Sequence, residues 1–160
     1  MSCLPPALHD PVAEAWAVAS ALVHPVCPPE ALEFYENVRQ LLPAMLREAK
    51  SEDFLDPLAR QAWQVISELA QREGLGAVNQ LTVSHELLRR GVRSPLLAKL
   101  SEWVTELPTP LLGLNAARIV RQCAERRRLH GLQREAEALA RGGAPSTMIS
   151  VRLHRPGAQG

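Results

Sequence analysis

The 160-residue sequence predicts an all-α protein, with a small helical bundle as its head and a C-terminal antiparallel helical hairpin. Two observations lead to this prediction. An N-capping residue is followed directly by proline at Asp10-Pro11, Asp56-Pro57 and Thr109-Pro110. Proline suits the first helical position because its missing N–H would have no helical partner there. Behind each start, apolar residues recur at intervals of three and four, which is the spacing of one helix face.

The first predicted helix covers residues 10–23, and its apolar side is formed by Ala15, Val18, Ala19 and Leu22. A second helical segment is predicted over residues 30–50. Pro43 lies inside that segment. Proline in a helix interior removes a hydrogen bond and clashes with the preceding turn, so a kink or a division into two helices is expected.

Residues 51–91 are predicted to form two further helices of the head. The first follows the Asp56 cap and stops at Gly74, since glycine readily adopts the left-handed conformation that ends helices. Thr82 is predicted to cap the second helix, and Gly91 to end it. Four large apolar residues are expected to anchor the core of this head: Phe54, Trp63, Ile66 and Leu69.

The hairpin is predicted from a helix that starts at Ser94-Pro95, a turn at Pro108, and a last helix that runs to about residue 141. Gly113 and Gly131 lie in this last helix, where each costs about 1 kcal/mol relative to alanine. The predicted organisation is a lead-in at residues 1–9, the head at 10–93, the hairpin at 94–141, and a flexible tail or linker at 142–160. Ile149, Val151 and Leu153 alternate in the tail, a pattern that allows a short strand.

Charge is distributed unevenly along the chain. Residues 1–117 carry nine basic and fourteen acidic side chains, whereas residues 118–160 carry nine and three. Such a basic segment predicts either a solvated helix face or contact with an acidic partner or nucleic acid. The six arginines considered for such contact are Arg118, Arg121, Arg126, Arg127, Arg128 and Arg134.

Several functional classes lack their sequence signatures. There is no glycine-rich phosphate loop with an adjoining lysine, so ATP hydrolysis by this chain is not expected. The histidines show no zinc-ligand spacing, and no cofactor is predicted. The three cysteines fit no disulfide framework, which favours reduced thiols in a cytoplasmic protein. No signal peptide or membrane-spanning segment is predicted.

Two sequence blocks resemble the N-terminal domain of DnaB-type replicative DNA helicases. The first is E-D-F-x-D-P, followed by I-x-E-L and later by L-T-V-x-x-E-L-x-R-R-G, within residues 52–91. The second is P-T-P-L-L-G-L-N-A-A-R-I-V-R at residues 108–121, which is similar to the family's P-(S/T)-A-A-N-x-x-x-Y-A-R-I-V-R. The chain is about a dozen residues longer than the family before the first block.

The resemblance implies a non-catalytic domain whose full-length parent would be an ATP-dependent DNA helicase. In that family the domain builds the helicase collar and docks the C-terminal region of primase or a helicase loader. Self-association into a dimer or larger assembly is therefore expected, since the hairpin carries more apolar surface than two helices bury between themselves. The expected interface residues are Leu97, Leu100, Trp103, Val104, Leu107, Ile119, Val120 and Cys123.

Two other hypotheses stay open at this stage. The chain could be a stand-alone accessory protein that modulates helicase or primase assembly, rather than an excised domain. It could also be a small nucleic-acid-binding protein that uses the basic last helix. Strong salt dependence of DNA affinity would distinguish the nucleic-acid hypothesis from the other two.

Overall fold

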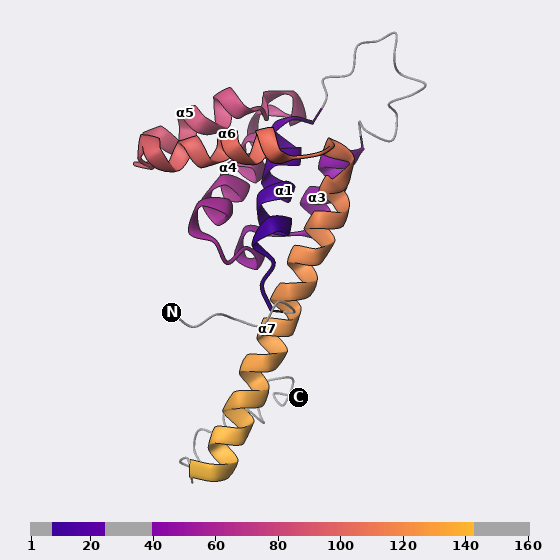
Figure 1. Cartoon of the computed structure of the whole chain (residues 1–160), viewed down its shortest axis with the longest axis vertical. Coiled ribbons are helices and arrows are strands. Elements are labelled where there is room, and N and C mark those ends of the chain that lie inside the picture. The colour runs from indigo at the N-terminus through magenta and orange to yellow at the C-terminus, as the bar shows by residue number, and fades with distance from the viewer. Residues whose placement is uncertain (1–7, 25–39, 143–160) are drawn as a thin grey trace. The chain divides into compact units, whose positions relative to one another are not determined.

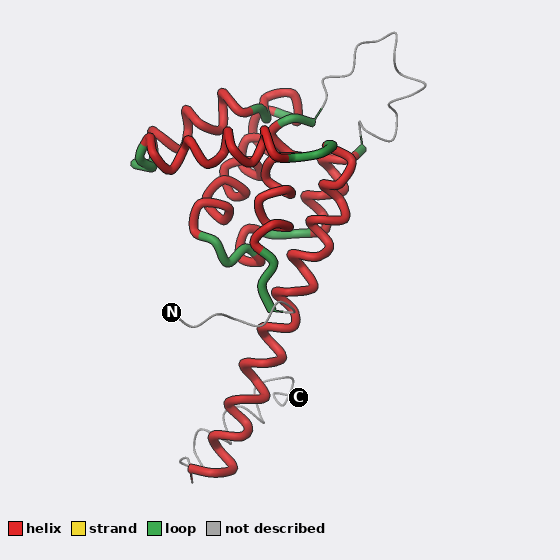
Figure 2. Tube along the Cα trace, in the orientation of Figure 1, coloured by secondary structure: helices red, strands yellow, loops and turns green. Residues whose placement is uncertain are grey.

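The computed structural model describes residues 8–24 and 40–142, and every regular element within them is helical (Figure 1, Figure 2). The all-α prediction is therefore confirmed. The α-helices of this part of the chain are α1 (Pro11–Leu22), α3 (Leu41–Glu48), α4 (Pro57–Glu73), α5 (Gln80–Arg89), α6 (Ser94–Glu106) and α7 (Gly113–Gly142). Short 3₁₀ turns occupy Ser51–Asp53, Leu75–Ala77 and Pro110–Leu112.

The chain divides into two compact units, which are described here separately. The first ends at Ala124 and the second begins at Glu125, so α7 contributes residues to both. The first unit contains the predicted head together with α6 and the first turns of α7. The predicted strand in the tail, at residues 149–153, lies outside the described residues.

Helix α1 is the central element of the first unit. Asp10 caps it, since its carboxylate accepts a hydrogen bond from the Ala13 N–H at 2.9 Å. Helices α3, α4 and α6 and the 3₁₀ turn Pro110–Leu112 all pack on α1. The sequence predicted that α1 has one apolar side. In the structure the three consecutive residues Ala17, Val18 and Ala19 are all completely buried, so α1 is buried on more than one side. Small side chains in three consecutive positions let neighbouring helices approach α1 from several directions.

Pro43 lies in the first turn of α3 rather than in the interior of a longer helix. The helix starts at Leu41, and the Ala44 N–H donates to the Gln40 carbonyl at 3.0 Å. Proline is tolerated in a first turn because its N–H would have no helical partner. The helix therefore begins around this proline instead of being kinked by it. Residues 25–39, which contain the rest of the predicted segment, lie outside the described residues.

Helix α4 begins and ends where the sequence predicts. The Asp56 carboxylate accepts a hydrogen bond from the Ala59 N–H at 2.9 Å, and Pro57 is the first helical residue. The helix ends at Gly74, whose φ of 94° is costly for any residue with a Cβ. The buried face of α4 carries most of the expected core anchors.

The expected core anchors lie in the interior of the first unit. Phe54, Trp63 and Ile66 are fully buried and Leu69 is nearly so. The rings of Phe54 and Trp63 pack with centroids 4.9 Å apart. The indole N–H of Trp63 donates to the Ala49 carbonyl at 3.0 Å. This bond joins α4 to the end of α3 and satisfies a polar group that would otherwise be buried without a partner.

The cap of α5 is Asn79 rather than Thr82, so the predicted cap was wrong. The Asn79 side chain accepts from the Thr82 N–H at 3.0 Å, and the Thr82 hydroxyl accepts from the Asn79 N–H at 3.2 Å. The two residues thus form a reciprocal capping box. The predicted end of the helix at Gly91, where φ is 93°, is confirmed.

Helices α6 and α7 follow one another across the proline turn, and the main packing partner of α6 is another helix. Helix α6 packs chiefly on α1 and also on α5, and the turn Pro110–Leu112 packs on α1. Gly113 starts α7 so close to α1 and α3 that a Cβ there would lie 2.6 Å from the Ser20 Cβ and 2.7 Å from the Met45 Sδ. The helices beside the turn are therefore organised around α1.

Candidate protein-interaction surfaces

A buried carboxylate from α1 holds the segment that leads into α4. Glu14 is 2% exposed, and its Oε1 accepts hydrogen bonds from the backbone N–H groups of Leu55 and Asp56 at 2.9 and 2.8 Å. Its Oε2 lies 3.0 Å from the His9 Nε2. Sequence analysis did not assign a role to Glu14, because its partners are about forty residues away along the chain.

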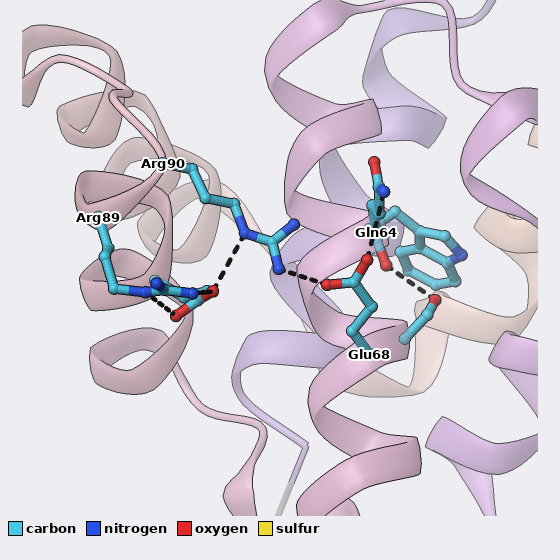
Figure 3. Close-up of polar contacts among 7 residues, drawn as sticks. Gln64, Glu68, Arg89 and Arg90 are labelled. Atoms are coloured by element: carbon cyan, nitrogen blue, oxygen red, sulfur yellow. Dashed lines mark hydrogen bonds and ion pairs between the residues drawn. The ribbon is translucent and has the colours of Figure 1, made fainter.

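An ion-pair network joins α4 to α5 (Figure 3). The Arg90 guanidinium binds the Glu68 carboxylate of α4, and its Nε donates to the Glu86 carboxylate of α5 at 3.1 Å. Arg89 makes two hydrogen bonds to Glu86, at 2.6 and 3.0 Å. On α4, Gln64 donates to Glu68 at 3.2 Å. The spacing of Glu86 and Arg90 is a helical signal, whereas the bond to Glu68 arises only in the folded chain.

This network lowers the pKa of each of its two carboxyl groups. Hydrogen bonds from Arg89, and then from Arg90, lower the pKa of Glu86 from 4.5 to about 2. The hydrogen bond from Arg90 is the main reason why the pKa of Glu68 is also lowered. Both shifts arise because the arginines stabilise the ionised form. We interpret the network as structural, because its arginines and glutamates bind one another.

The eight expected interface residues fall into two groups. Leu100, Val120 and Cys123 are buried in the core of the first unit, so they are not accessible to a partner. Helix α6, which carries Leu100, packs chiefly on α1, a contact that the sequence did not predict. The other five are partly buried and remain accessible: Leu97, Trp103, Val104, Leu107 and Ile119.

An apolar groove of about 330 Å³ lies between α1 and the first turns of α7. Val12, Trp16, Leu112 and Ile119 form its apolar lining, and Asp10 and Asn115 are among the polar residues at it. Val12 is 54% exposed. Trp16, on α1, is partly exposed and lines the groove together with Ile119.

The six arginines do not share one environment. Arg118 and Arg121 belong to the first unit, and their guanidinium groups lie 4.0 and 3.0 Å from the Glu48 carboxylate of α3. Because Glu48 partly neutralises their charge, Arg118 and Arg121 should attract an acidic partner less strongly. The other four arginines lie in the second unit, on the helical residues 125–142: Arg126, Arg127, Arg128 and Arg134.

The helical part of the second unit exposes two large apolar side chains that sequence analysis did not single out. Leu129 is 66% exposed and Leu132 is 55% exposed. Leu139, one further heptad along from Leu132, is partly exposed. The spacing of these leucines places them on one helix face, and this spacing is the signal that could have identified them from the sequence.

Clusters of metal-ligating side chains and membrane-spanning helices were both sought among the described residues. No three histidine, cysteine, aspartate or glutamate side chains in this part of the chain are grouped as metal ligands. No helix within it is long and apolar enough to cross a bilayer. The groove between α1 and α7, the accessible residues of α6, and the leucines of α7 are therefore the main candidates for functional contacts.

Comparison with solved structures gives a match along nearly the whole chain. The crystal structure of the N-terminal domain of DnaB helicase from Mycobacterium tuberculosis matches with a TM-score of 0.68 and 20% sequence identity. The match covers 92% of this chain and 96% of that chain. This chain has the fold of a DnaB helicase N-terminal domain. No protein-family model and no curated protein matches its sequence.

The DnaB N-terminal fold agrees with the sequence blocks that carried the resemblance. Residues 52–91 form most of the first 3₁₀ turn, all of α4 and all of α5. Residues 108–121 form the proline turn and the first turns of α7. The blocks thus contain the caps of α4 and α5 and the proline turn before α7. They do not include Leu129 and Leu132 of the second unit.

Proposed function

We propose that this chain is a non-catalytic protein-interaction and oligomerisation module of the DNA replication machinery. The observation that supports this most strongly is the match in fold to a DnaB helicase N-terminal domain over 96% of that domain. The sequence resemblance to the same domain in residues 52–91 and 108–121 supports it independently. ATP turnover that copurifies with the folded chain through successive columns would contradict the proposal.

The proposed partner is the C-terminal region of primase, or alternatively a helicase loader. The groove between α1 and α7 is a suitable contact surface, because it combines an apolar lining with the polar residues Asp10 and Asn115 at its edge. Protein interfaces generally have such an apolar centre with polar residues around it. Trp16 in this groove adds the type of residue that often dominates binding energy.

The test is capture of the purified primase C-terminal region from the same organism by the immobilised full chain. Wild-type protein is expected to retain it. Ile119→Glu, which adds a carboxylate to the groove, should weaken capture by at least about tenfold, in line with a dominant interface residue. Leu81→Glu is the matched control, since Leu81 is 80% exposed on α5 and lies outside the groove.

The outcomes distinguish the hypotheses. If Ile119→Glu and Leu81→Glu capture the primase region equally well, the groove is not the contact surface for primase. Failure to capture primase or loader, combined with capture of the organism's replicative helicase, would favour the stand-alone accessory protein. Failure with all three partners would contradict the proposed function.

Self-association is the second part of the proposal. Its support is the accessible apolar surface that remains on α6 and α7 after Leu100, Val120 and Cys123 are assigned to the core. Sedimentation velocity of the full chain over a range of concentrations should show a dimer or a larger species, because association depends on concentration. A monomer throughout that range would contradict this part.

Nucleic-acid binding is a weaker candidate, supported by the exposed Arg126, Arg128 and Arg134 of the second unit. If these residues contact phosphates, affinity for DNA should fall steeply as salt rises. Fluorescence anisotropy with labelled DNA at several salt concentrations measures this. Affinity that is too weak to detect at low salt would exclude this candidate.

A further inference from the structure

A second groove of the first unit, with a volume of about 470 Å³, is lined by residues of α3 and α4. It shares no lining residue with the groove between α1 and α7. One wall contains Leu46 and Arg47 near the end of α3 and Lys50 just after it. The other wall contains Ser67 and Ala70, which are three residues apart and so lie on one face of α4. We call this surface the α3–α4 groove.

The lining of the α3–α4 groove is partly apolar, and its two walls are joined. Leu46 and Ala70 are half-buried and pack against the hydrophobic core, whereas Leu75, after α4, is 37% exposed. The indole N–H of Trp63 on α4 donates to the Ala49 carbonyl at the end of α3, at 3.0 Å. A groove whose walls are already joined in the folded chain loses less conformational entropy when a ligand binds.

The charged residues of the α3–α4 groove are two cations and one carboxylate, a net charge of +1. Arg47 and Lys50 are exposed, and no carboxylate among the described residues pairs with either of them. The Lys50 ammonium donates to the Leu46 carbonyl at 3.1 Å. The single carboxylate of the lining belongs to Glu52. A surface with excess positive charge beside an apolar lining is complementary to an acidic partner that also carries apolar side chains.

We propose that the α3–α4 groove docks an acidic peptide segment of another protein, which carries at least one large apolar side chain. Carboxylates of the peptide pair with Arg47 and Lys50, and its apolar side chain packs on Leu46 and Leu75. Gln71, also in the lining, has a donor and an acceptor for the peptide backbone. This partner is distinct from primase, so the inference does not depend on the function proposed for the groove between α1 and α7.

A peptide is more complementary to the α3–α4 groove than a nucleic-acid strand. Nucleic acids are bound mainly by cations that neutralise successive phosphates, whereas Glu52 adds a repelling carboxylate to this lining. No aromatic side chain is among the described residues that line the groove, so bases would have no ring on which to stack.

The first experiment selects peptides from a random library displayed on phage, with the immobilised full chain as the target. Enriched sequences should be acidic and should contain a large apolar residue. Fluorescence anisotropy with labelled synthetic copies then measures affinity. Arg47→Glu/Lys50→Glu should lower affinity at least about tenfold, because attraction is replaced by repulsion. Arg93→Glu/Lys99→Glu is the matched control, since it makes the same change of charge at exposed positions outside the groove and should retain binding.

The second experiment repeats the selection with Arg47→Glu/Lys50→Glu as the target. Three carboxylates then line the groove, counting Glu52, so the enriched peptides should be basic. Loss of folding would abolish selection and could not reverse its charge preference. Leu75→Ser should weaken binding of the acidic peptides to the otherwise unchanged chain without altering the preference for acidic sequences. Circular dichroism and thermal melting establish that the variants are folded.

The proposal is overturned if no acidic sequence is enriched on the wild-type chain, or if Arg47→Glu/Lys50→Glu binds the enriched peptides as tightly as wild type. Labelled DNA that binds wild type more tightly than any enriched peptide, and that Arg47→Glu/Lys50→Glu does not bind, would assign the groove to nucleic acid instead. A wild-type oligomer that becomes monomeric in the same variant would assign the groove to a second copy, which also overturns the proposal.

A segment of the chain itself is the remaining alternative occupant, since residues 30–36 include three glutamates, Leu32 and Phe34. Acidic peptides that bind only after Glu30, Glu33 and Glu36 are replaced by glutamine would assign the groove to that segment and overturn docking of another protein.

Capture of the primase C-terminal region separates this inference from the proposed function. Arg47→Glu/Lys50→Glu should capture primase as well as wild type does, and Ile119→Glu should still bind the acidic peptides. Loss of primase capture by Arg47→Glu/Lys50→Glu would identify primase as the occupant and overturn a separate partner. Absence of primase capture by the wild-type chain would count against the proposed function and leave docking of the acidic peptide intact.

Discussion

Glu14 is the residue whose chemistry contrasts most with its surroundings. It lies on α1 among completely buried alanines and valine, and it is 2% exposed. Burial of a carboxylate is costly unless hydrogen bonds compensate for lost hydration. Here the backbone N–H groups of Leu55 and Asp56 provide two such bonds. Because Asp56 is itself the cap of α4, Glu14 fixes the position at which that helix begins.

Replacement of Glu14 should destabilise the first unit in proportion to the acceptors removed. Glu14→Leu leaves two backbone donors unpaired and should lower the free energy of unfolding by about 2–5 kcal/mol. Glu14→Gln retains one side-chain oxygen as an acceptor and should lose less. Chemical denaturation monitored by circular dichroism measures both. Equal stability of Glu14→Leu and wild type would contradict the proposed role.

Gly113 and Gly131 lie in the same helix but should respond in opposite ways to alanine. A Cβ at Gly113 would lie 2.6 Å from the Ser20 Cβ and 2.7 Å from the Met45 Sδ, so α1, α3 or α7 would have to shift. A Cβ at Gly131 meets nothing within 4 Å. Gly113→Ala should therefore lower the melting temperature of the first unit, despite the higher helix propensity of alanine.

Gly131→Ala is the matched comparison for that variant. It should raise helicity in the second unit, because alanine favours a helix by about 1 kcal/mol relative to glycine. Circular dichroism at low temperature measures the change. A Gly113→Ala protein that melts above wild type would show that the close approach of α7 to α1 is not required.

At the scale of elements, α4 and α5 are held together by Arg90, which binds carboxylates on both helices. The folded pKa of Glu86 lies at about 2, below its ordinary value of 4.5. The folded state thus binds protons less readily than the unfolded state. The stabilisation is complete above about pH 4.5 and is lost as pH falls towards about 2.

Glu86→Gln tests this dependence. The variant should be less stable than wild type at about pH 7, and the difference should narrow as pH falls through about 4.5 towards 3. Urea denaturation at several pH values measures the difference. Glu106→Gln, at an exposed position in the last turn of α6, controls for the loss of one carboxylate. A difference that stays constant over this pH range would contradict the assignment.

Elements whose determinants are local could be predicted from the sequence, and contacts between distant elements could not. The caps Asp10 and Asp56 and the stops Gly74 and Gly91 act within one helical turn, and all were predicted correctly. The cap of α5 was misplaced because Asn79 and Thr82 are both capping residues three positions apart. Their reciprocal bonds show that both take part.

Packing around α1 explains why the candidate site was only partly predicted. The apolar spacing of α6 and α7 indicated which residues avoid water, but it could not indicate which helix covers them. Leu100 and Val120 were therefore assigned to an interface, and the structure places them in the core. Leu129 and Leu132 of the second unit also recur at helical spacing. That spacing alone does not distinguish a buried helix face from an exposed one, and the structure shows that these two leucines are exposed.

At the scale of the whole molecule, the residues that stabilise the fold and the residues proposed for self-association lie in different units. The large buried side chains, including Trp63, Phe54 and Leu42, belong to the first unit. None of the helical residues 125–142 of the second unit is buried, and they include the exposed Leu129 and Leu132. Folding of the first unit should therefore be independent of those residues, whereas self-association should require them.

A chain that ends at Ala124 tests this separation directly. It should retain a single cooperative unfolding transition with a melting temperature within a few degrees of the full chain, because the core of the first unit is unchanged. It should also sediment as a monomer where the full chain is a dimer, since the exposed Leu129 and Leu132 are absent. Calorimetry and sedimentation velocity measure the two properties separately. Loss of the unfolding transition on truncation would show that the second unit contributes to folding, and a truncated dimer would move the association surface to α6 or to the groove lined by Ile119.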